Sequence, residues 1–409
     1  MGKTRPADIP APGLPTAGLA GRARIRQVME LARRHLRMDV TLVSRIADGA
    51  QHFRAVDGHA DSFDLAVGGS VPLEETYCDL MLRGQIPHVV PDVAAVPALQ
   101  QLEATAGSAI SAYAGVPLRH SDGTLYGTLC CIGHGPAPHL DDRDTAFLAM
   151  LAELLVDDLD AERARELATD RIAQTLRDER LSLALQPVVE LISGRCIGFE
   201  ALSRFDYGPP DVVFAQAEEV GLGVELERLA ARKAAALVPQ LRGDRYLAAN
   251  LTPKAAVALG ELAVHMPGLP WERMVLEITE HSSVIDYSVL RQVLQPLRER
   301  GMRVAIDDAG AGFASLHHVA KLEPDIIKVD RSLIAGLDSS RAQRSIVASF
   351  VLLGLDSGAS LVAEGVETRE ELCTLIDLGV DAAQGYLLGR PSTDPLDLEH
   401  WLDRNSLLP

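Results

Sequence analysis

Short apolar runs alternate with amphipathic segments through the second half of the chain, from about residue 181. The segments 289–300 and 342–355 show the three- and four-residue spacing of helices that bury one face. The predicted strands are 183–189, 196–204, 246–251, 274–279, 303–307, 325–329, 360–363 and 381–384. Eight strands separated mostly by helices favour an α/β fold of the (β/α)8 barrel type over an open sheet.

The first part of the chain has a different pattern. The predicted elements there are a helix at 22–38 and β-like runs at 40–45, 52–56, 86–90, 112–119 and 125–132. The dipeptide Asp122-Gly123 separates the last two runs, which is typical of a β-hairpin. We therefore expect an α+β domain at 22–140 that contains an antiparallel sheet.

The connecting segment is predicted to be helical, because residues 141–186 contain neither Gly nor Pro. Its apolar residues recur at three- and four-residue steps up to Leu159, and the stripe then weakens, so a continuous coiled coil is not supported. One long helix or two abutting ones at 141–180 would link the domains and dimerise the chain. The other boundaries that we expect are a disordered tail at 1–21 and a barrel at 181–405.

Charge and composition narrow the choice of partners. The 409 residues include 57 acidic and 39 basic side chains, which gives a formal net charge of −18 and disfavours binding to a nucleic-acid polymer. The longest apolar run, Ile346–Leu355, is too short to cross a bilayer, and the Pro-rich N-terminus does not resemble a signal peptide. Five cysteines without a CxxC motif fit a reducing cytoplasm. We therefore expect a cytoplasmic protein without a membrane partner.

Polar side chains collect where the predicted barrel strands end. They are Glu200, Asn250, Glu277, Asp307, Asp308, Lys328, Asp330, Glu364 and Gln384, from seven successive strands. A single acid at a strand end is usually a helix cap or a turn residue. Repetition over seven strands instead favours one shared site, because the carboxyl ends of barrel strands lie at the same mouth.

The chemistry of these groups points to metal ions. Buried carboxylates without partners are costly, and bound cations would hold several together. The candidate ligands Glu200, Asn250, Glu277, Asp307 and Asp308 all offer oxygen, which suits Mg²⁺ or Mn²⁺. A pair of divalent ions is a common device for phosphodiester hydrolysis, in which Glu364 would take a proton from water and Lys328 would neutralise charge or hold the water.

A series of short motifs runs through this region in the order Gln186-Pro187, Glu200-Ala201-Leu202-Ser203-Arg204, Asn250-Leu251-Thr252, Glu277-Ile278-Thr279-Glu280, Asp307-Asp308-Ala309-Gly310, Lys328-Val329-Asp330, Ala363-Glu364-Gly365-Val366-Glu367-Thr368, Gln384-Gly385-Tyr386-Leu387 and Gly389-Arg390-Pro391. In sequence and order these motifs resemble the EAL family of bacterial cyclic di-GMP phosphodiesterases. They span roughly residues 181–402. The resemblance implies a barrel whose first strand is antiparallel to the others.

The resemblance also implies roles for individual residues. Glu200, Asn250, Glu277 and Asp307 would bind the first of two Mg²⁺ or Mn²⁺ ions, and Asp307 would bridge to the second with Asp308 beside it. Glu364 would be the general base and Lys328 would position the attacking water. The substrate pocket would be lined by Gln186, Leu202, Arg204, Asp330 and Gln384, with Glu280 and Glu367 in support. The chain departs from the family pattern at Ala309 and Ala311 in the loop after the fifth strand, and at Leu185 before Gln186.

The N-terminal part contains the strings Glu74-Glu75-Thr76-Tyr77-Cys78, Val89-Val90-Pro91-Asp92, Ala114-Gly115-Val116-Pro117-Leu118 and Gly127-Thr128-Leu129-Cys130-Cys131. With these motifs, residues 22 to about 160 resemble a GAF sensory domain. Such domains bind small ligands or only dimerise. For Cys78 and Cys130 we favour buried core thiols over a redox or chromophore role.

Together these features predict hydrolysis of cyclic di-GMP to linear pGpG by a homodimer, with regulation by the N-terminal domain and its unknown ligand. One alternative is a barrel that binds cyclic di-GMP without cutting it and signals to a protein partner. Another is a phosphodiesterase for a different substrate such as a glycerophosphodiester, which explains the metal ligands but not Arg204, Lys328 and Gln384. No segment resembles a domain that synthesises cyclic di-GMP.

Overall fold

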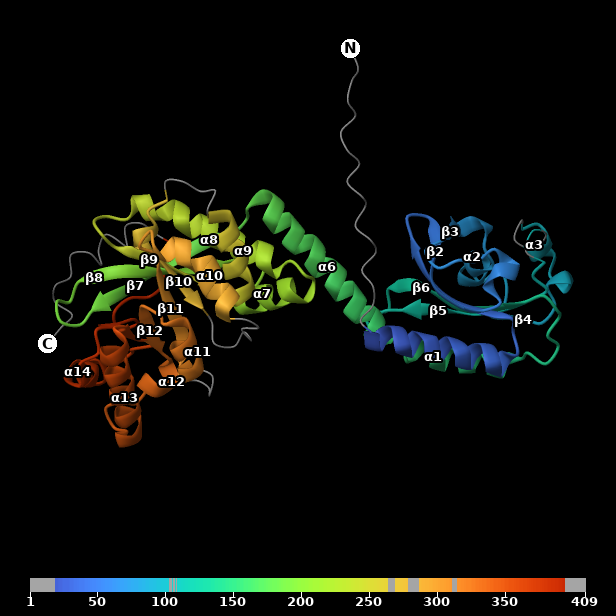
Figure 1. Ribbon diagram of the computed structural model, residues 1–409. Helices are drawn as coiled ribbons and strands as arrows, with labels where there is room; N and C mark the ends of the chain where they lie inside the picture. The colour runs from blue at the N-terminus through green and yellow to red at the C-terminus, as the bar shows by residue number, and fades with distance from the viewer. Residues whose placement is uncertain are drawn as a thin grey trace, which may run out of the picture. The chain divides into compact units, whose positions relative to one another are not determined.

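The computed structural model describes residues 19–102, 105, 107, 109–263, 269–278, 287–310 and 315–393. The chain forms two compact units, with the boundary between residues 167 and 168 (Figure 1). Each unit has its own hydrophobic core, as expected for domains of this size.

The first unit is built on a six-stranded antiparallel sheet in the order β3-β2-β1-β6-β5-β4, which confirms the expected α+β fold. Its strands are β1 (Val40–Ala47), β2 (Ala50–Gly58), β3 (Ser70–Pro72), β4 (Val89–Val90), β5 (Ala112–Arg119) and β6 (Leu125–Gly133). The predicted hairpin joins β5 and β6, and Gly123 takes a left-handed φ of +82° in its turn. The edge strand β3 was missing from our prediction, because three residues that include Ser and Pro carry little strand signal.

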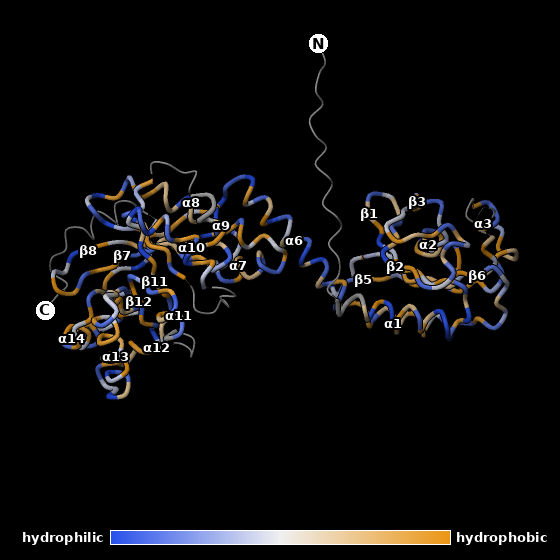
Figure 2. Tube along the Cα trace, in the orientation of Figure 1, coloured by the Kyte–Doolittle hydropathy of each residue, from blue (hydrophilic) through white to orange (hydrophobic). Residues whose placement is uncertain are grey.

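Two cores lie on opposite faces of this sheet. On one face, α1 (Leu19–Leu36) and α5 (Asp142–Glu153) bury apolar side chains, and Figure 2 shows hydrophobic and hydrophilic stretches alternating along α1. The short helices α2 (Tyr77–Leu82) and α3 (Pro97–Gln100) contribute to the core on the other face. Adjacent strand residues point to opposite faces, so Cys130 belongs to the α2 side and Cys131 to the α1 side.

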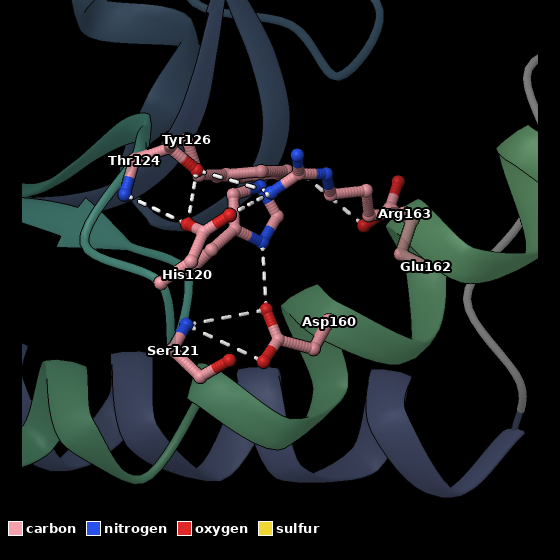
Figure 3. A network of polar contacts seen from close by, with 8 residues as sticks. His120, Ser121, Thr124, Tyr126, Asp160, Glu162 and Arg163 are labelled. Carbon is pink, nitrogen blue, oxygen red and sulfur yellow. Dashed lines mark hydrogen bonds and ion pairs between the residues drawn. The ribbon is translucent and has the colours of Figure 1, made fainter.

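The connecting segment forms two helices, α5 and α6 (Val156–Asp178), and α5 begins with a capping box between Asp141 and Asp144. The first half of α6 is attached to the sheet of the first unit by polar contacts (Figure 3). Asp160 accepts a hydrogen bond of 2.8 Å from His120, and Arg163 donates one of 2.8 Å to Asp122. Beyond residue 167, Ala168 and Ile172 of the same helix are buried in an apolar cluster of the second unit.

The second unit contains the predicted barrel, closed by eight strands in the order β10-β11-β12-β13-β14-β7-β8-β9. The strands are β7 (Ser182–Glu190), β8 (Cys196–Arg204), β9 (Tyr246–Leu251), β10 (Met274–Ile278), β11 (Arg303–Ala309), β12 (Ile326–Val329), β13 (Ser360–Ala363) and β14 (Ala382–Ala383). Strand β7 is antiparallel to both of its neighbours and the other pairs are parallel, which confirms the expected modification of the barrel.

Helices surround the barrel strands and bury the largest apolar cluster of this unit. They are α7 (Pro210–Glu219), α8 (Gly223–Leu237), α9 (Pro253–Ala263), α10 (Tyr287–Arg298), α11 (Ser315–Leu322), α12 (Arg331–Ile334), α13 (Arg341–Ser357) and α14 (Arg369–Leu378). A smaller apolar cluster, which includes Val188, Tyr246 and Val275, fills the barrel interior. Gly198 leaves room for it, since a Cβ at this position would lie 2.6 Å from the Tyr246 ring.

Candidate active site

The polar residues of the barrel mouth form the next layer above the apolar interior cluster. Side chains repeat with a period of two along a strand, so the residue two positions after an interior apolar residue also faces the interior. The successive pairs are Gly198 and Glu200, Ala248 and Asn250, Val275 and Glu277, Ala305 and Asp307, Ile326 and Lys328, Val362 and Glu364, and Ala382 and Gln384. Strand β7 runs the other way, so its polar residue Gln186 comes two positions before Val188.

Lys328 lies among four carboxylates of this layer. Its Nζ is 2.7 Å from Oε1 of Glu364, 2.9 Å from Oε2 of Glu277 and 2.9 Å from Oδ1 of Asp307. The fourth contact is to Oε2 of Glu200, at 3.5 Å. The Lys328 side chain is 3% exposed, so these charges interact with little screening by solvent.

The shared lysine changes the proton affinities of the acids around it. Burial alone would lower the pKa of Lys328, but the attraction of the surrounding carboxylates outweighs it and raises that pKa well above its usual value. Burial raises the pKa of Glu277 and of Glu364 against the attraction of Lys328. Burial alone would also raise the pKa of Glu200. Lys328 and the amides of Gln384 and Asn250 outweigh burial there, and the pKa of Glu200 is lowered.

A bulge in β11 brings two consecutive acids to the same site. Ile306 pairs with Ile327 and Ala309 with Val329, so β11 has one residue more than β12 between these two pairs. Asp308 has a left-handed φ of +57°, a conformation that is unfavourable for most non-glycine residues and is often found at functional sites. Because of the extra residue, Asp307 and Asp308 both have carboxylate oxygens within 4.8 Å of one from Glu364.

Two amide side chains hold the carboxylate of Glu200 in place, and a third extends their network. Asn250 donates a hydrogen bond of 2.7 Å to its Oε1, and Gln384 donates one of 2.6 Å to its Oε2. Gln384 also donates to Gln186 at 2.9 Å, and Gln186 in turn donates to the carbonyl of Gly389 at 2.9 Å. Within the part of the chain that the structure describes, the buried Oδ1 of Asn250 and Oε1 of Gln384 have no hydrogen-bond donor.

The residues at this mouth fit divalent cations. Two sets of acids each have oxygens within 4.8 Å of one another, Glu200 with Glu277 and Asp307, and Asp307 with Asp308 and Glu364. These five carboxylates and the one ammonium of Lys328 leave a formal charge of −4, which two divalent ions would balance. The donors are all oxygens, and the unpartnered Asn250 Oδ1 is one more. The acidic residues can therefore hold metal ions, with Asp307 common to both sets.

A cavity of about 450 Å³ adjoins the carboxylate layer. Leu202, Arg204, Asn250 and Asp307 line it, together with the aromatic ring of Phe214. Arg204 donates a hydrogen bond of 2.8 Å to the carbonyl of Ser203 and supplies a cation at the cavity wall. This volume is within the range of small-molecule sites in proteins.

Other predicted site residues lie at the edge of this site or outside the described chain. Asp330 caps helix α12 by accepting a hydrogen bond of 3.0 Å from the backbone of Ser332. Glu367 forms an exposed ion pair of 2.8 Å with Arg331. Their roles in substrate binding and support stay predictions. Glu280 and Ala311 lie outside the described residues.

The departures from the family pattern leave the described site intact. Ala309 is fully buried, and Leu185 packs into the core between the strands and helices. Gly310 follows with a φ of +102°, and a Cβ there would lie 2.3 Å from Leu333. These residues therefore affect packing behind the mouth.

Two acids that our sequence analysis missed support the loops of the site. Glu227 accepts hydrogen bonds from the backbone and hydroxyl of Thr252, at 2.6 and 3.0 Å, two residues after Asn250. Glu371 accepts bonds of 3.0 Å from the backbones of Gly336, Glu367 and Thr368, and so fixes the turn that follows Glu364. The spacing of Thr368 and Glu371 is a capping-box signal that was readable in the sequence, whereas the Glu227 contact depends on the tertiary fold.

The barrel has eight strands, one of them reversed, and a layer of carboxylates surrounds a buried lysine at its mouth. These features define a class of barrel proteins with a candidate metal-binding mouth. The chain belongs to the EAL-domain family, whose family model matches residues 169–391, more than half of its length. The family model of the GAF domain matches residues 22–156. Both resemblances noted in the sequence are thus confirmed.

Several curated proteins are similar to this chain. The cyclic di-GMP phosphodiesterase NbdA of Pseudomonas aeruginosa is 31% identical over 54% of this chain and 30% of its own length. The probable cyclic di-GMP phosphodiesterase PdeD of Escherichia coli is 32% identical over 56% of this chain and 44% of its own length. Among solved structures, an EAL domain protein from Listeria monocytogenes covers 55% of this chain and 94% of that chain, with 28% identity and a TM-score of 0.50.

The chain spans about a third of the length of several curated relatives, from 29% to 32% for three of them. In the described residues, no helix combines the length and the apolar character needed to cross a membrane.

Proposed function

We propose that this protein hydrolyses cyclic di-GMP to linear pGpG. The observation that carries the proposal is the carboxylate layer around Lys328, with Asp307 common to two sets of candidate metal ligands. The names of the relatives NbdA and PdeD supply the substrate, since both are described as cyclic di-GMP phosphodiesterases. Arg204 at the wall of the adjoining cavity offers a cation for a phosphate or a partner for a base edge.

In this proposal Glu200, Asn250, Glu277 and Asp307 would hold one Mg²⁺ or Mn²⁺ ion, and Asp307 and Asp308 would hold a second. When bound, such ions make hydroxide available near neutral pH and stabilise negative charge on the phosphate. Glu364 accepts the proton of the attacking water, since its carboxylate lies at the mouth beside the ammonium of Lys328 and next to Asp307 and Asp308. Lys328, held beside Glu364, orients that water.

The remaining residues position the substrate. Gln186 and Gln384 form one buried amide network that fixes Glu200, and Leu202 and Arg204 line the cavity beside it. We assign Asp330 to the substrate side as well, and Glu280 and Glu367 to the support of the loops. Removing the ions would leave about four uncompensated negative charges at the mouth, so a chelator should weaken nucleotide binding as well as turnover.

Incubating the purified protein with cyclic di-GMP and either Mg²⁺ or Mn²⁺ tests the proposal, with pGpG measured by chromatography. Formation of pGpG that stops on addition of a chelator is the expected result. Calorimetric binding without any product, in folded protein and in either metal, would instead support a receptor that signals to a protein partner. A product formed from a glycerophosphodiester but not from cyclic di-GMP would support a different phosphodiesterase.

We further propose that the chain acts as a homodimer and that its GAF domain regulates turnover. This proposal is supported by the presence of that domain and by helix α6, which contains the boundary between the two units. Sedimentation would give the oligomeric state. Comparing turnover of the full chain with that of residues 168–409 would measure regulation, and identical rates would contradict it.

A further inference from the structure

The first unit contains a cavity of about 360 Å³ on the α2 side of its sheet. Its walls are mostly aromatic and aliphatic and include Phe53, Phe63, Tyr77, Tyr113 and Ile132. Its polar lining includes Gln51, Thr76, Cys78 and Cys130. The cavity therefore suits a small, largely apolar molecule that presents one reactive or polar group to these side chains.

Two thiols meet at this cavity. Cys78 belongs to α2 and Cys130 to β6, and their Sγ atoms are 3.6 Å apart. Both side chains are buried against protein atoms, yet both line the cavity, so a molecule that occupies the cavity would reach them. A disulfide bond needs an S–S distance of about 2.05 Å, which requires an approach of about 1.5 Å between these sulfurs.

Donors converge on the sulfur of Cys78 from three other side chains. Thr128 Oγ1 lies 3.2 Å away, Gln51 Nε2 3.3 Å and the Tyr113 hydroxyl 3.5 Å. Cys78 is also hydrogen-bonded to the sulfur of Cys130. A sulfur surrounded by donors is stabilised as a thiolate, which is the nucleophilic form. The hydrogen bond with Cys130 accordingly lowers the pKa of Cys78, while the same contact raises the pKa of Cys130.

The surroundings do not favour a metal site. Among the described residues, the groups of three or more acidic, histidine or cysteine side chains close enough to share an ion are the two sets at the barrel mouth. Cys131, next in sequence, faces the other side of the sheet and contacts Thr41. Cys78 and Cys130 thus form a pair without a third ligand, the arrangement of a nucleophilic thiol and a resolving thiol.

We propose that this cavity is a site at which Cys78 reacts with a small hydroperoxide and Cys130 resolves the product into a disulfide. The Cys78 sulfur attacks the terminal peroxide oxygen, the O–O bond breaks, and the departing oxygen takes up a proton to leave as an alcohol or as water. Cys78 is then a sulfenic acid. Attack by the Cys130 thiol forms the S–S bond and releases one water, so two thiols are oxidised while one peroxide is reduced.

Differential alkylation of the full chain tests the proposal. The native protein is treated with one equivalent of cumene hydroperoxide or of hydrogen peroxide, denatured and alkylated, and its cysteine peptides are identified by mass spectrometry. We expect a Cys78–Cys130 cross-linked peptide, a mass lower by two hydrogens and three alkylated thiols of the five. Faster reaction with the organic peroxide is expected because the walls are apolar. An equal or slower rate would overturn the cavity as the binding site.

Variants separate the pair from the other cysteines. Cys130→Ser should leave a sulfenic acid on Cys78 that dimedone traps, whereas Cys131→Ser, the matched control on the same strand, should react like the parent. Tyr113→Phe removes one donor to Cys78 and should slow the reaction about three- to tenfold through loss of thiolate. The proposal is overturned if oxidation in the parent chain is confined to the exposed Cys373. It is equally overturned if Cys131→Ser abolishes cross-linking in a chain with an unchanged circular dichroism spectrum.

Discussion

Oε1 of Glu364 lies 2.7 Å from Nζ of Lys328, and Oδ1 of Asp307 lies 2.9 Å from the same nitrogen. The lysine therefore joins the carboxylate to which we assign proton transfer with the carboxylate shared by both candidate metal sets. This contact constrains Glu364, which lies on a short loop after β13. A variant that changes either carboxylate therefore also changes the electrostatic environment of the Lys328 ammonium.

Glu364→Gln is expected to lower turnover of cyclic di-GMP by about 10²–10⁴-fold, because an amide cannot accept the proton of the attacking water. Nucleotide affinity should change little, since the residues that line the adjoining cavity are untouched. Steady-state turnover and calorimetry would measure both. Glu367→Gln, on the same loop but exposed, is the matched control and should retain activity above one tenth of the parent. Equal loss of binding and turnover in Glu364→Gln would reassign this residue to metal binding.

Lys328→Met should destabilise the metal-free second unit by about 3–5 kcal/mol, the usual range for breaking a buried ion pair. The variant leaves the carboxylates of Glu277 and Asp307 without their cation. Denaturant unfolding in a chelator would measure the loss, and added Mg²⁺ should restore part of it. In the exposed pair of Lys254 and Glu218, Lys254→Met should cost less than about 1 kcal/mol. Similar costs for the two variants would mean that the carboxylates are protonated in the folded state.

Divalent ions should stabilise the parent protein. An ion at 100 times its dissociation constant raises the free energy of unfolding by about 2.7 kcal/mol if it binds only the folded state. A thermal shift on adding Mn²⁺ or Mg²⁺, reversed by a chelator, is the measurement. Asp307→Asn weakens a residue common to both ligand sets, so it should abolish most of the shift. A full shift in this variant would place the ions elsewhere.

Replacing Asp308 separates backbone strain from ligand chemistry. Asp308→Gly suits the φ of +57° and should keep or raise stability, whereas Asp308→Ala should lie about 1–2 kcal/mol lower than the glycine variant. Both variants remove the carboxylate and should lose metal-dependent turnover to a similar extent. Denaturant unfolding and turnover assays would check the two effects. Activity retained in Asp308→Gly would show that the bulge, and not the carboxylate, matters.

Two adjacent residues of α6 should differ in what they contribute to the first unit. Glu162 pairs with Arg54, and their side chains are 7% and 16% exposed, while Arg163 pairs with Asp122 and both are about half exposed. Glu162→Ala should cost about 3–5 kcal/mol because it leaves a largely buried guanidinium without its carboxylate, and Arg163→Ala about 0–1 kcal/mol. Hydrogen exchange of the backbone amides in β2 would measure the free energy of unfolding of each variant. Equal losses in the two variants would contradict the expectation that the more buried ion pair contributes more.

Much of the barrel and of its mouth can be predicted from the local pattern of apolar and polar residues in the sequence. Period-two alternation identifies Glu277, Lys328 and Glu364 as interior residues once the strands are placed, and the ordered motifs fix the family. The contacts of Lys328 with four acids depend on how strands from distant parts of the sequence close the barrel. Those contacts were not readable from the chain.

Other features depend on irregularities that carry little sequence signal. The extra residue in β11 changes the direction of Asp308, although Asp307-Asp308 looks like any strand end. Similarly, Cys78 and Cys130 are 52 positions apart, and only the packing of α2 on the sheet reveals that their sulfurs touch. The resemblance to the GAF family favours core thiols for both, because that family often has cysteine or another small residue at these positions. Their burial agrees with that interpretation, but burial alone does not describe a pair beside a cavity.

The bulge in β11 also limits how such a site can arise. In an unbroken strand neighbouring side chains face opposite sides, so no amino-acid exchange alone would give a regular barrel two consecutive acids at its mouth. A regular strand would need one added residue to bring a second acid to the mouth, and that residue would have to accept a left-handed backbone. Engineering a second carboxylate into a related barrel should likewise begin with an insertion, and deleting one residue here should turn the second acid away irrespective of its identity.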